Sequence, residues 1–383
     1  MSLRTKLAAY FVYLMQDTPH HGIDTLVLKL LEWASIAYQK GVEKTYASYA
    51  NHPQKQAKLP AKVISLGNIT VGGTGKTPMA CFLARYLQQQ GFRTALLNRG
   101  YRSEKEDQAA IMSDGEHILL TPAVGGDEAC LMARSLPGIP VLVGRKRSRS
   151  GQLAVDMFQS QILLLDDGFQ HWQLYRDLDI VLIDGTNPFG NGYLLPRGIL
   201  REPLYQLRRA GLIIITKADL ADAQQLEHIY ETVRCYHPHV PIAEAVHRPR
   251  WCISFADWNS FTARTACPSL PRSQAVIAVS ALGNPASFEE TIRSFGYQVT
   301  DTMRYDDHHQ YSQADLAAMV QKAQAQKAQA QKAVLVTTEK DAVKMDASYI
   351  AAHDVPLYVL GIEIEIIKGK QEIDDVLQHV LGG

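Results

Sequence analysis

Short apolar runs recur along the chain, each followed by polar or glycine-rich residues and then by a stretch with helical spacing. Such runs are typical of strands buried on both faces of a parallel sheet, and their alternation with helices predicts an α/β fold. The expected strands of the first series are Val63–Leu66, Thr94–Leu97, Val141–Val143, Ile162–Leu165, Ile180–Ile183 and Leu212–Thr216.

A second and shorter series of strands and helices begins at Ala275 and predicts a smaller α/β domain. The stretch from Ile242 to Pro271 contains prolines and two tryptophans and cannot be assigned to a helix or a strand. The repeat Gln321–Lys332 consists of good helix formers without an apolar stripe, so we interpret it as a solvated helix extension. The expected elements of this series are Ala275–Val279, a helix near Ser287–Phe295, Ala333–Thr337 and Val355–Ile364.

The first 50 residues predict two helical segments, one over about Leu3–Met15 and a second from Ile23 onward with apolar side chains at helical spacing. Such a helix either packs against its own domain or lies in a membrane interface, and periodicity alone favours the first of these. The polar, proline-containing stretch Asn51–Pro60 is typical of a linker.

The clearest chemical signal follows the first strand, where a glycine-rich turn ends in Gly75-Lys76-Thr77 and a helix begins. This is the layout of a phosphate-binding P-loop, in which Lys76 reaches the outer phosphates and the Thr77 hydroxyl contacts Mg²⁺. The full pattern has glycine where this chain has Thr70, and the alternative is a glycine-rich turn without a ligand. The expected nucleotide contacts are Thr70, Gly72, Gly73, Thr74, Gly75, Lys76 and Thr77.

A second signal is the apolar strand that ends in Asp166-Asp167 and continues as Gly168-Phe169-Gln170-His171. An acid at a strand end is the partner that a P-loop needs for Mg²⁺. Successive strand residues point to opposite sides, so we expect only one of the two acids to face the metal. The sequence leaves open which one; Asp166 is the first choice, with Asp167 close to the reaction, and the alternative is a strand end with solvated acids. His171 either touches the substrate or orders the loop.

Asp127 follows two glycines and precedes an apolar helix. A carboxylate there either caps the helix or orients a substrate hydroxyl and accepts its proton. Three basic loops follow strands, and their arginines suit phosphate oxygens, although charge runs are also typical of a solvated face. These loops are Asn98–Arg102, Arg145–Arg149 and Pro196–Pro203.

Composition narrows the classes of function. The chain has 383 residues and a net charge of zero, which gives no basic field for nucleic acid. Its five cysteines show no zinc-binding spacing, so we expect a reducing compartment. No apolar run is as long as a membrane span.

Together these motifs resemble the tetraacyldisaccharide 4'-kinase family, the lipid A 4'-kinases of Gram-negative bacteria. The resemblance extends over nearly the whole chain. Thr70 is usual in that family, whereas Asn98 stands where the family often has Ser. The motifs are GNITVGGTGKTP, RGY at Arg99–Tyr101, GGDE at Gly125–Glu128, DDGFQH at Asp166–His171, PRGILREP at Pro196–Pro203, DDHH at Asp306–His309 and TTEKDAVK at Thr337–Lys344.

The resemblance implies transfer of the γ-phosphate of ATP to the 4'-hydroxyl of a tetraacyldisaccharide 1-phosphate, which gives lipid IVA, with Mg²⁺ as cofactor. It implies a membrane-embedded lipid disaccharide as substrate, peripheral attachment to the cytoplasmic face of the bacterial inner membrane, and no obligate protein partner. The expected regions are membrane-associating helices at 1–50, a P-loop kinase domain at 51–240, and a smaller α/β domain with linker strands at 241–383.

The resemblance also implies roles for single residues. Asp127 is expected as the catalytic base, paired with His308, with His309 as the alternative partner, while Lys76 assists transfer. The expected metal residues are Thr77, Asp166, Asp167 and Glu202, and the expected substrate contacts are Asn98, Arg99, Arg147, His171, Arg197 and Arg201.

Two other classes of function also fit the residues. One is a P-loop NTPase switch or metallochaperone, in which Thr216-Lys217-Ala218-Asp219 would read guanine. The other is a P-loop kinase or ligase with a soluble acceptor, against which the apolar N-terminal helices speak.

Overall fold

The computed structural model describes residues 10, 13–15, 22–101, 103–260, 270–306, 309–328 and 333–382. Two compact units are present: unit 1 comprises residues 1–80, 160–246 and 365–383, and unit 2 comprises residues 81–159 and 247–364. These units differ from the expected regions, because residues 81–159 group with the C-terminal part of the chain. The expected domain bounds stay a prediction.

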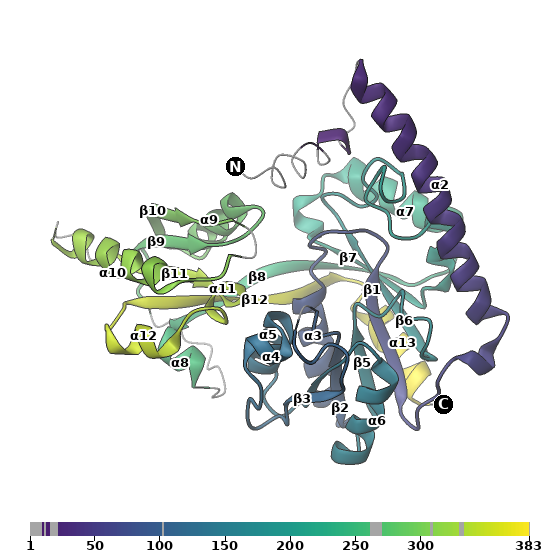
Figure 1. Cartoon of the computed structure of the whole chain (residues 1–383), viewed down its shortest axis with the longest axis horizontal. Helices are drawn as coiled ribbons and strands as arrows, with labels where there is room; N and C mark the ends of the chain where they lie inside the picture. Colours follow the sequence, from purple (N-terminus) through teal and green to yellow (C-terminus); the bar gives the residue numbers. More distant parts are fainter. Residues whose placement is uncertain are drawn as a thin grey trace. The chain divides into compact units, whose positions relative to one another are not determined.

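Unit 1 is built on parallel strands in the order β8-β7-β6-β1-β5 (Figure 1). At the centre of this sheet, Leu66 of β1 pairs with Asp166 of β5 and Ile180 of β6, so the P-loop and the Asp166-Asp167 pair leave the sheet at the same edge. The strands are β1 (Lys62–Asn68), β5 (Ile162–Asp166), β6 (Leu178–Asp184), β7 (Leu212–Thr216) and the first part of β8 (Ile242–Ser254).

The longest helix of unit 1 is α2, which Figure 1 shows as one continuous helix. Ser35 is buried on its inner face, whereas Trp33 is 73% exposed on its outer face. The helices are α2 (Ile23–Ala50), η1 (Pro53–Lys55), the start of α3 (Lys76–Gln89), η2 (Leu204–Arg209), η3 (Ala218–Leu220), α7 (Ala223–Tyr236) and α13 (Lys370–Leu381).

Unit 2 contains two groups of strands. In one, β2 and β4 are parallel and β3 is antiparallel to β4; in the other, β10, β9, β11 and β12 are parallel neighbours. These strands are β2 (Thr94–Asn98), β3 (Ala110–Ser113), β4 (Val141–Val143), β9 (Ala275–Ser280), β10 (Gln298–Arg304), β11 (Val334–Thr338) and β12 (Leu357–Lys368).

The helices of unit 2 include α5, which begins at Asp127, and α11, which Thr338 caps through its side chain. They are α4 (Pro122–Gly125), α5 (Asp127–Ser135), α6 (Arg147–Phe158), α8 (Phe255–Asn259), α9 (Pro285–Ser294), α10 (Gln313–Ala328), α11 (Glu339–Ala342) and α12 (Ala347–Ala352).

The predicted α/β fold is confirmed, and each expected strand overlaps an observed one. Two of them, at 333–337 and 355–364, were expected to begin before Val334 of β11 and Leu357 of β12, where the observed strands begin. Strand β8 comes from the stretch for which no element was predicted, and β3 and β10 were not expected either. The helical repeat continues α10 to Ala328, and most of the first expected N-terminal helix lies outside the described residues. None of the helices that the structure describes is long and apolar enough to cross a membrane.

Candidate active site

The P-loop connects the end of β1 at Asn68 to the start of α3 at Lys76. Gly72 has φ 122° and Gly75 has φ 78°, a region of backbone space that favours glycine. A Cβ atom on Gly72 or Gly73 would meet no atom within 4 Å, so the space beside these residues is open. The first N–H groups of a helix have no partner within the helix, so this turn can bind an anion.

Asp167 lies between two cations at the base of this loop. Its carboxylate accepts two hydrogen bonds from Arg201, at 2.7 and 3.3 Å, and its Oδ1 atom is 3.7 Å from Nζ of Lys76. The Oδ1 atom of Asn68 accepts from both Lys76 and Arg201, at 3.2 and 3.3 Å. Asn68, Lys76, Asp167 and Arg201, here called the Asp167 centre, therefore form one connected group.

The two adjacent acids differ in position. Asp166 is the last residue of β5 and is 4% exposed, whereas Asp167 follows it with φ 51° and a side chain that is 38% exposed. Asp167 is thus the acid that faces the P-loop lysine. The metal contacts expected of Asp166 and Asp167 stay predictions.

Glu202 is fully buried and paired on both oxygens. Its Oε1 atom accepts from Gln170 at 2.7 Å and its Oε2 atom accepts from Arg209 at 2.6 Å. Burial raises the pKa of Glu202, while the Arg209 cation acts to lower it. This arrangement holds the Glu202 carboxylate between two side chains inside the protein. The metal contact expected of Glu202 stays a prediction.

Gln170 and Arg209, the two partners of Glu202, also contact neighbouring parts of the chain. Gln170 also donates to the backbone carbonyl of Asn68 at 2.9 Å, and the Arg209 guanidinium lies 3.8 Å from the ring centroid of Phe169. A Cβ atom on Gly67 would lie 2.6 Å from Cβ of Phe169, so β1 and the loop after β5 are in tight contact. Together these contacts fix the loop that carries Asp167.

The Thr216-Lys217-Ala218-Asp219 loop donates hydrogen bonds to the backbone of the P-loop. Lys217 donates to the carbonyl of Gly73 at 3.0 Å and forms an ion pair with Asp184. The Thr216 hydroxyl donates to the carbonyl of Thr74 at 3.0 Å. This loop therefore supports the backbone that surrounds the open space.

In unit 2, Asp127 is the first residue of α5 and is half-buried. Gln310 donates to its Oδ2 atom at 3.4 Å. The alternative partner, His309, contacts Asp315 at 3.1 Å and stacks on Tyr305. The described contacts of the His309 ring are therefore with these two residues and not with Asp127. His308 lies outside the described residues, and its expected pairing with Asp127 stays a prediction.

Comparison with known proteins decides the family. The family model of tetraacyldisaccharide-1-P 4'-kinases matches residues 27–382. The chain belongs to this family. The tetraacyldisaccharide 4'-kinase of Halothermothrix orenii is 37% identical over 384 residues, which cover 98% of each chain. That of Syntrophus aciditrophicus is 38% identical over 361 residues, which cover 92% of this chain and 93% of the relative.

A solved structure shares the fold of this kinase. It is the "apo" form of LpxK from Aquifex aeolicus in complex with ATP, with a TM-score of 0.70 and 24% sequence identity. The likeness covers 93% of this chain and 99% of that one. The family and the fold class expected from the sequence are confirmed.

Two residues of the kinase that are expected to contact the substrate form hydrogen bonds with nearby backbone. Asn98 is buried, and its Oδ1 atom accepts from the N–H of Gly100 at 2.7 Å. Arg147 is 3% exposed and donates to the carbonyl of Gly144 at 3.1 Å. Both side chains shape the turns after β2 and β4, and the substrate contacts expected of them stay predictions.

Other expected substrate residues lie at the surface or hold a loop. Arg99 is exposed and pairs with Glu106 at 2.8 Å. His171 is half-buried beside the Asp167 loop, with its carbonyl accepting from Arg176 at 2.7 Å. Arg197 donates to the carbonyl of Leu14 at 3.2 Å, so its guanidinium connects the 196–203 loop to the N-terminal region.

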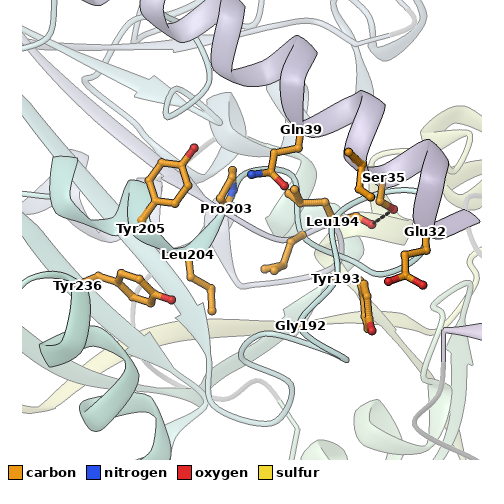
Figure 2. Close-up of a pocket in the computed structure, with 12 residues that line it drawn as sticks. Glu32, Ser35, Gln39, Gly192, Tyr193, Leu194, Pro203, Leu204, Tyr205 and Tyr236 are labelled. Atoms are coloured by element: carbon orange, nitrogen blue, oxygen red, sulfur yellow. Dashed lines mark hydrogen bonds between the residues drawn. The ribbon is translucent and has the colours of Figure 1, made fainter.

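A cavity of about 360 Å³ lies between α2 and the loop that precedes η2. Figure 2 shows Ser35, Gln39, Leu194 and Tyr205 among the residues that line it, with the hydrogen bond from Ser35 to Leu194. The loop that carries Arg201 is therefore packed against α2 on one side.

Sequence reasoning gave no role to Asn68 or Arg209. Asn68 stands inside the GNIT stretch, directly after an apolar strand, which was a usable signal. Arg209 follows another arginine in a short helix, and nothing in the sequence separates it from a solvated charge.

Proposed function

We propose that this kinase transfers the γ-phosphate of ATP to the 4'-hydroxyl of a tetraacyldisaccharide 1-phosphate, forming lipid IVA in lipid A biosynthesis. The observation that supports this most directly is the Asp167 centre, in which one carboxylate orders Lys76 and Arg201 beside an open P-loop. Phosphoryl transfer requires cationic groups positioned beside the phosphate oxygens, and it requires little covalent chemistry from the protein.

In this mechanism the P-loop N–H groups and Lys76 bind the β- and γ-phosphates. Arg201 offers a planar pair of donors for phosphate oxygens. Because Asp167 and Asn68 already order both cations, little reorganisation is needed at the moment of transfer.

Mg²⁺ neutralises phosphate charge when it is bound, and the residues present suit it. Thr77, Asp166 and Asp167 offer oxygen donors, which Mg²⁺ prefers, and the rest of its shell normally comes from phosphates and water. The described residues contain no group of three or more His, Cys, Asp or Glu side chains able to hold a metal ion alone. A nucleotide-borne ion that needs few protein ligands fits this donor set.

Asp127 is proposed as the base that orients the acceptor hydroxyl and takes its proton. It is half-buried, and its described partner is the neutral amide of Gln310, which leaves the carboxylate without a bound cation among these contacts. The proposed acceptor is a lipid disaccharide and no nucleic acid, and no obligate protein partner is proposed.

The outer face of α2 is proposed to lie on the cytoplasmic surface of the inner membrane, where the acyl chains of the substrate are. Ile23, Leu26, Leu30 and Trp33 recur at helical spacing and are 79, 62, 62 and 73% exposed. A face of this kind gains free energy when it is buried at the boundary of headgroups and acyl chains.

The test is transfer of labelled phosphate from ATP to the tetraacyldisaccharide 1-phosphate in detergent micelles. Wild type is expected to form a phosphorylated lipid, and Lys76→Ala and Asp127→Ala are expected to lose nearly all of this activity. An unimpaired Asp127→Ala variant would remove Asp127 as the base. Hydrolysis of GTP with no lipid product would overturn the proposed function in favour of an NTPase switch.

A further inference from the structure

The segment Ile199–Arg201 is held against the P-loop on one side. The N–H of Arg201 donates to the carbonyl of Ile69 at 2.7 Å, and the N–H of Val71 donates to the carbonyl of Ile199 at 2.8 Å. These two bonds form a short antiparallel bridge. The position of the Arg201 backbone therefore depends on the P-loop.

On its other side, the same segment is held by α2. The hydroxyl of Tyr38 donates to the carbonyl of Arg201 at 3.1 Å. The Tyr38 ring is half-buried and packs against the core cluster that contains Ile69, Phe169 and Leu200. Burial raises the pKa of Tyr38, so the hydroxyl remains a donor at neutral pH.

We propose that Tyr38 is a positioning residue for phosphoryl transfer, because it fixes the backbone from which Arg201 reaches Asp167 and Asn68. Its hydroxyl contacts neither the P-loop nor Asp167 among the contacts described, and it acts through Arg201. A two-point guanidinium contact depends on both distance and angle, so a small displacement of the Arg201 backbone weakens it.

The chain offers a matched control for this residue. Tyr205 joins α2 to η2, which directly follows the loop, through a hydrogen bond from its hydroxyl to Glu43. That bond holds η2 and does not involve Arg201. Tyr38→Phe and Tyr205→Phe therefore each remove one tyrosine hydroxyl that links α2 to the segment 199–209, and only the first removes a contact to Arg201.

The proposal rests on the proposed function and is tested in the same lipid kinase assay, with wild type as the reference arm. Tyr38→Phe is expected to lower kcat about 10-fold with KM for the lipid changed less than about twofold, because the loss acts on the transition state. Tyr205→Phe is expected to keep kcat within about twofold of wild type.

A double-mutant cycle separates positioning from general loss of structure. In an Arg201→Ala background, Tyr38→Phe is expected to lower kcat by less than about twofold, because the group through which Tyr38 acts is absent. An independent 10-fold loss in that background, or equal losses in Tyr38→Phe and Tyr205→Phe, would overturn the proposal while wild-type activity upholds the proposed function.

Amide hydrogen exchange measures the order of the 196–203 backbone directly and does not depend on kinase activity. Peptides that cover residues 196–203 are expected to exchange faster in Tyr38→Phe than in wild type and Tyr205→Phe. Unchanged exchange in Tyr38→Phe would overturn the proposal, and this result is available even if wild type forms no lipid product.

Discussion

Arg201 donates hydrogen bonds from two guanidinium nitrogens to the Asp167 carboxylate, at 2.7 and 3.3 Å. These bonds join the 196–203 loop to the loop after β5. Both residues belong to unit 1, yet they are 34 positions apart in the chain. The Asp167 carboxylate thus sets the position of the Arg201 guanidinium, the second cation beside Lys76.

The planar fork of Arg201 is expected to matter as well as its charge. Arg201→Lys retains the charge but loses the two-point contact, and we expect kcat to fall about 100-fold. Steady-state phosphate transfer to the lipid checks this. The control is Arg208→Lys, an exposed arginine of η2 that is expected to keep wild-type kcat; an Arg201→Lys variant with full activity would show that charge alone suffices.

The buried Glu202–Arg209 pair predicts a pH-dependent stability effect. Arg209 lowers the pKa of Glu202 in the folded state, so Arg209→Met lets burial raise that pKa further above its ordinary value of 4.5. A carboxyl whose folded pKa is raised contributes stability below its unfolded pKa and loses it as pH rises through the folded pKa. The free energy of unfolding should therefore fall further below wild type as pH increases from 4.5.

Near neutral pH the expected loss for Arg209→Met is about 3–5 kcal/mol, since the variant leaves an uncompensated buried carboxylate. Urea unfolding of wild type and variant between pH 4.5 and 8 measures it. A loss that is the same at every pH would mean that Arg209 acts only through its packing on Phe169.

Gly67 predicts a steric effect on stability. In Gly67→Ala the new Cβ would lie 2.6 Å from Cβ and 2.7 Å from the backbone N of Phe169, and we expect a loss of about 1–3 kcal/mol. The control is Gly41→Ala in α2, where a Cβ meets nothing within 4 Å and better helix propensity should add about 0.5–1 kcal/mol. Thermal unfolding compares the two, and equal effects would contradict the predicted contact.

The outer face of α2 predicts lipid binding. Replacing Leu30 and Trp33 by Ser removes two side chains that are 62 and 73% exposed, and binding to phospholipid vesicles should fall about 10-fold or more. Co-sedimentation with vesicles measures this. ATP binding serves as the control and should be unchanged, and a variant that sediments like wild type would contradict membrane contact by this face.

The sequence alone predicted those features that depend on neighbours in the chain. The P-loop, the acids after β5 and most strands were recognised because turn glycines, apolar runs and strand ends act over a few residues. Strand β8 was missed because Pro249 and charged residues interrupt its apolar positions, whereas in the fold it pairs with β7 and β12.

What the tertiary structure decided is which side chain meets which. The motifs predicted Asp166, Asp167 and Glu202 as metal residues and Arg201 as a substrate contact. Only the fold turns Asp167 toward Lys76 and buries Glu202 against Arg209. It also gave Tyr38 a partner 163 residues away. Motifs determine the chemistry that is available, whereas hydrogen bonds between distant segments depend on distances of a few tenths of an ångström, which only the packed chain sets.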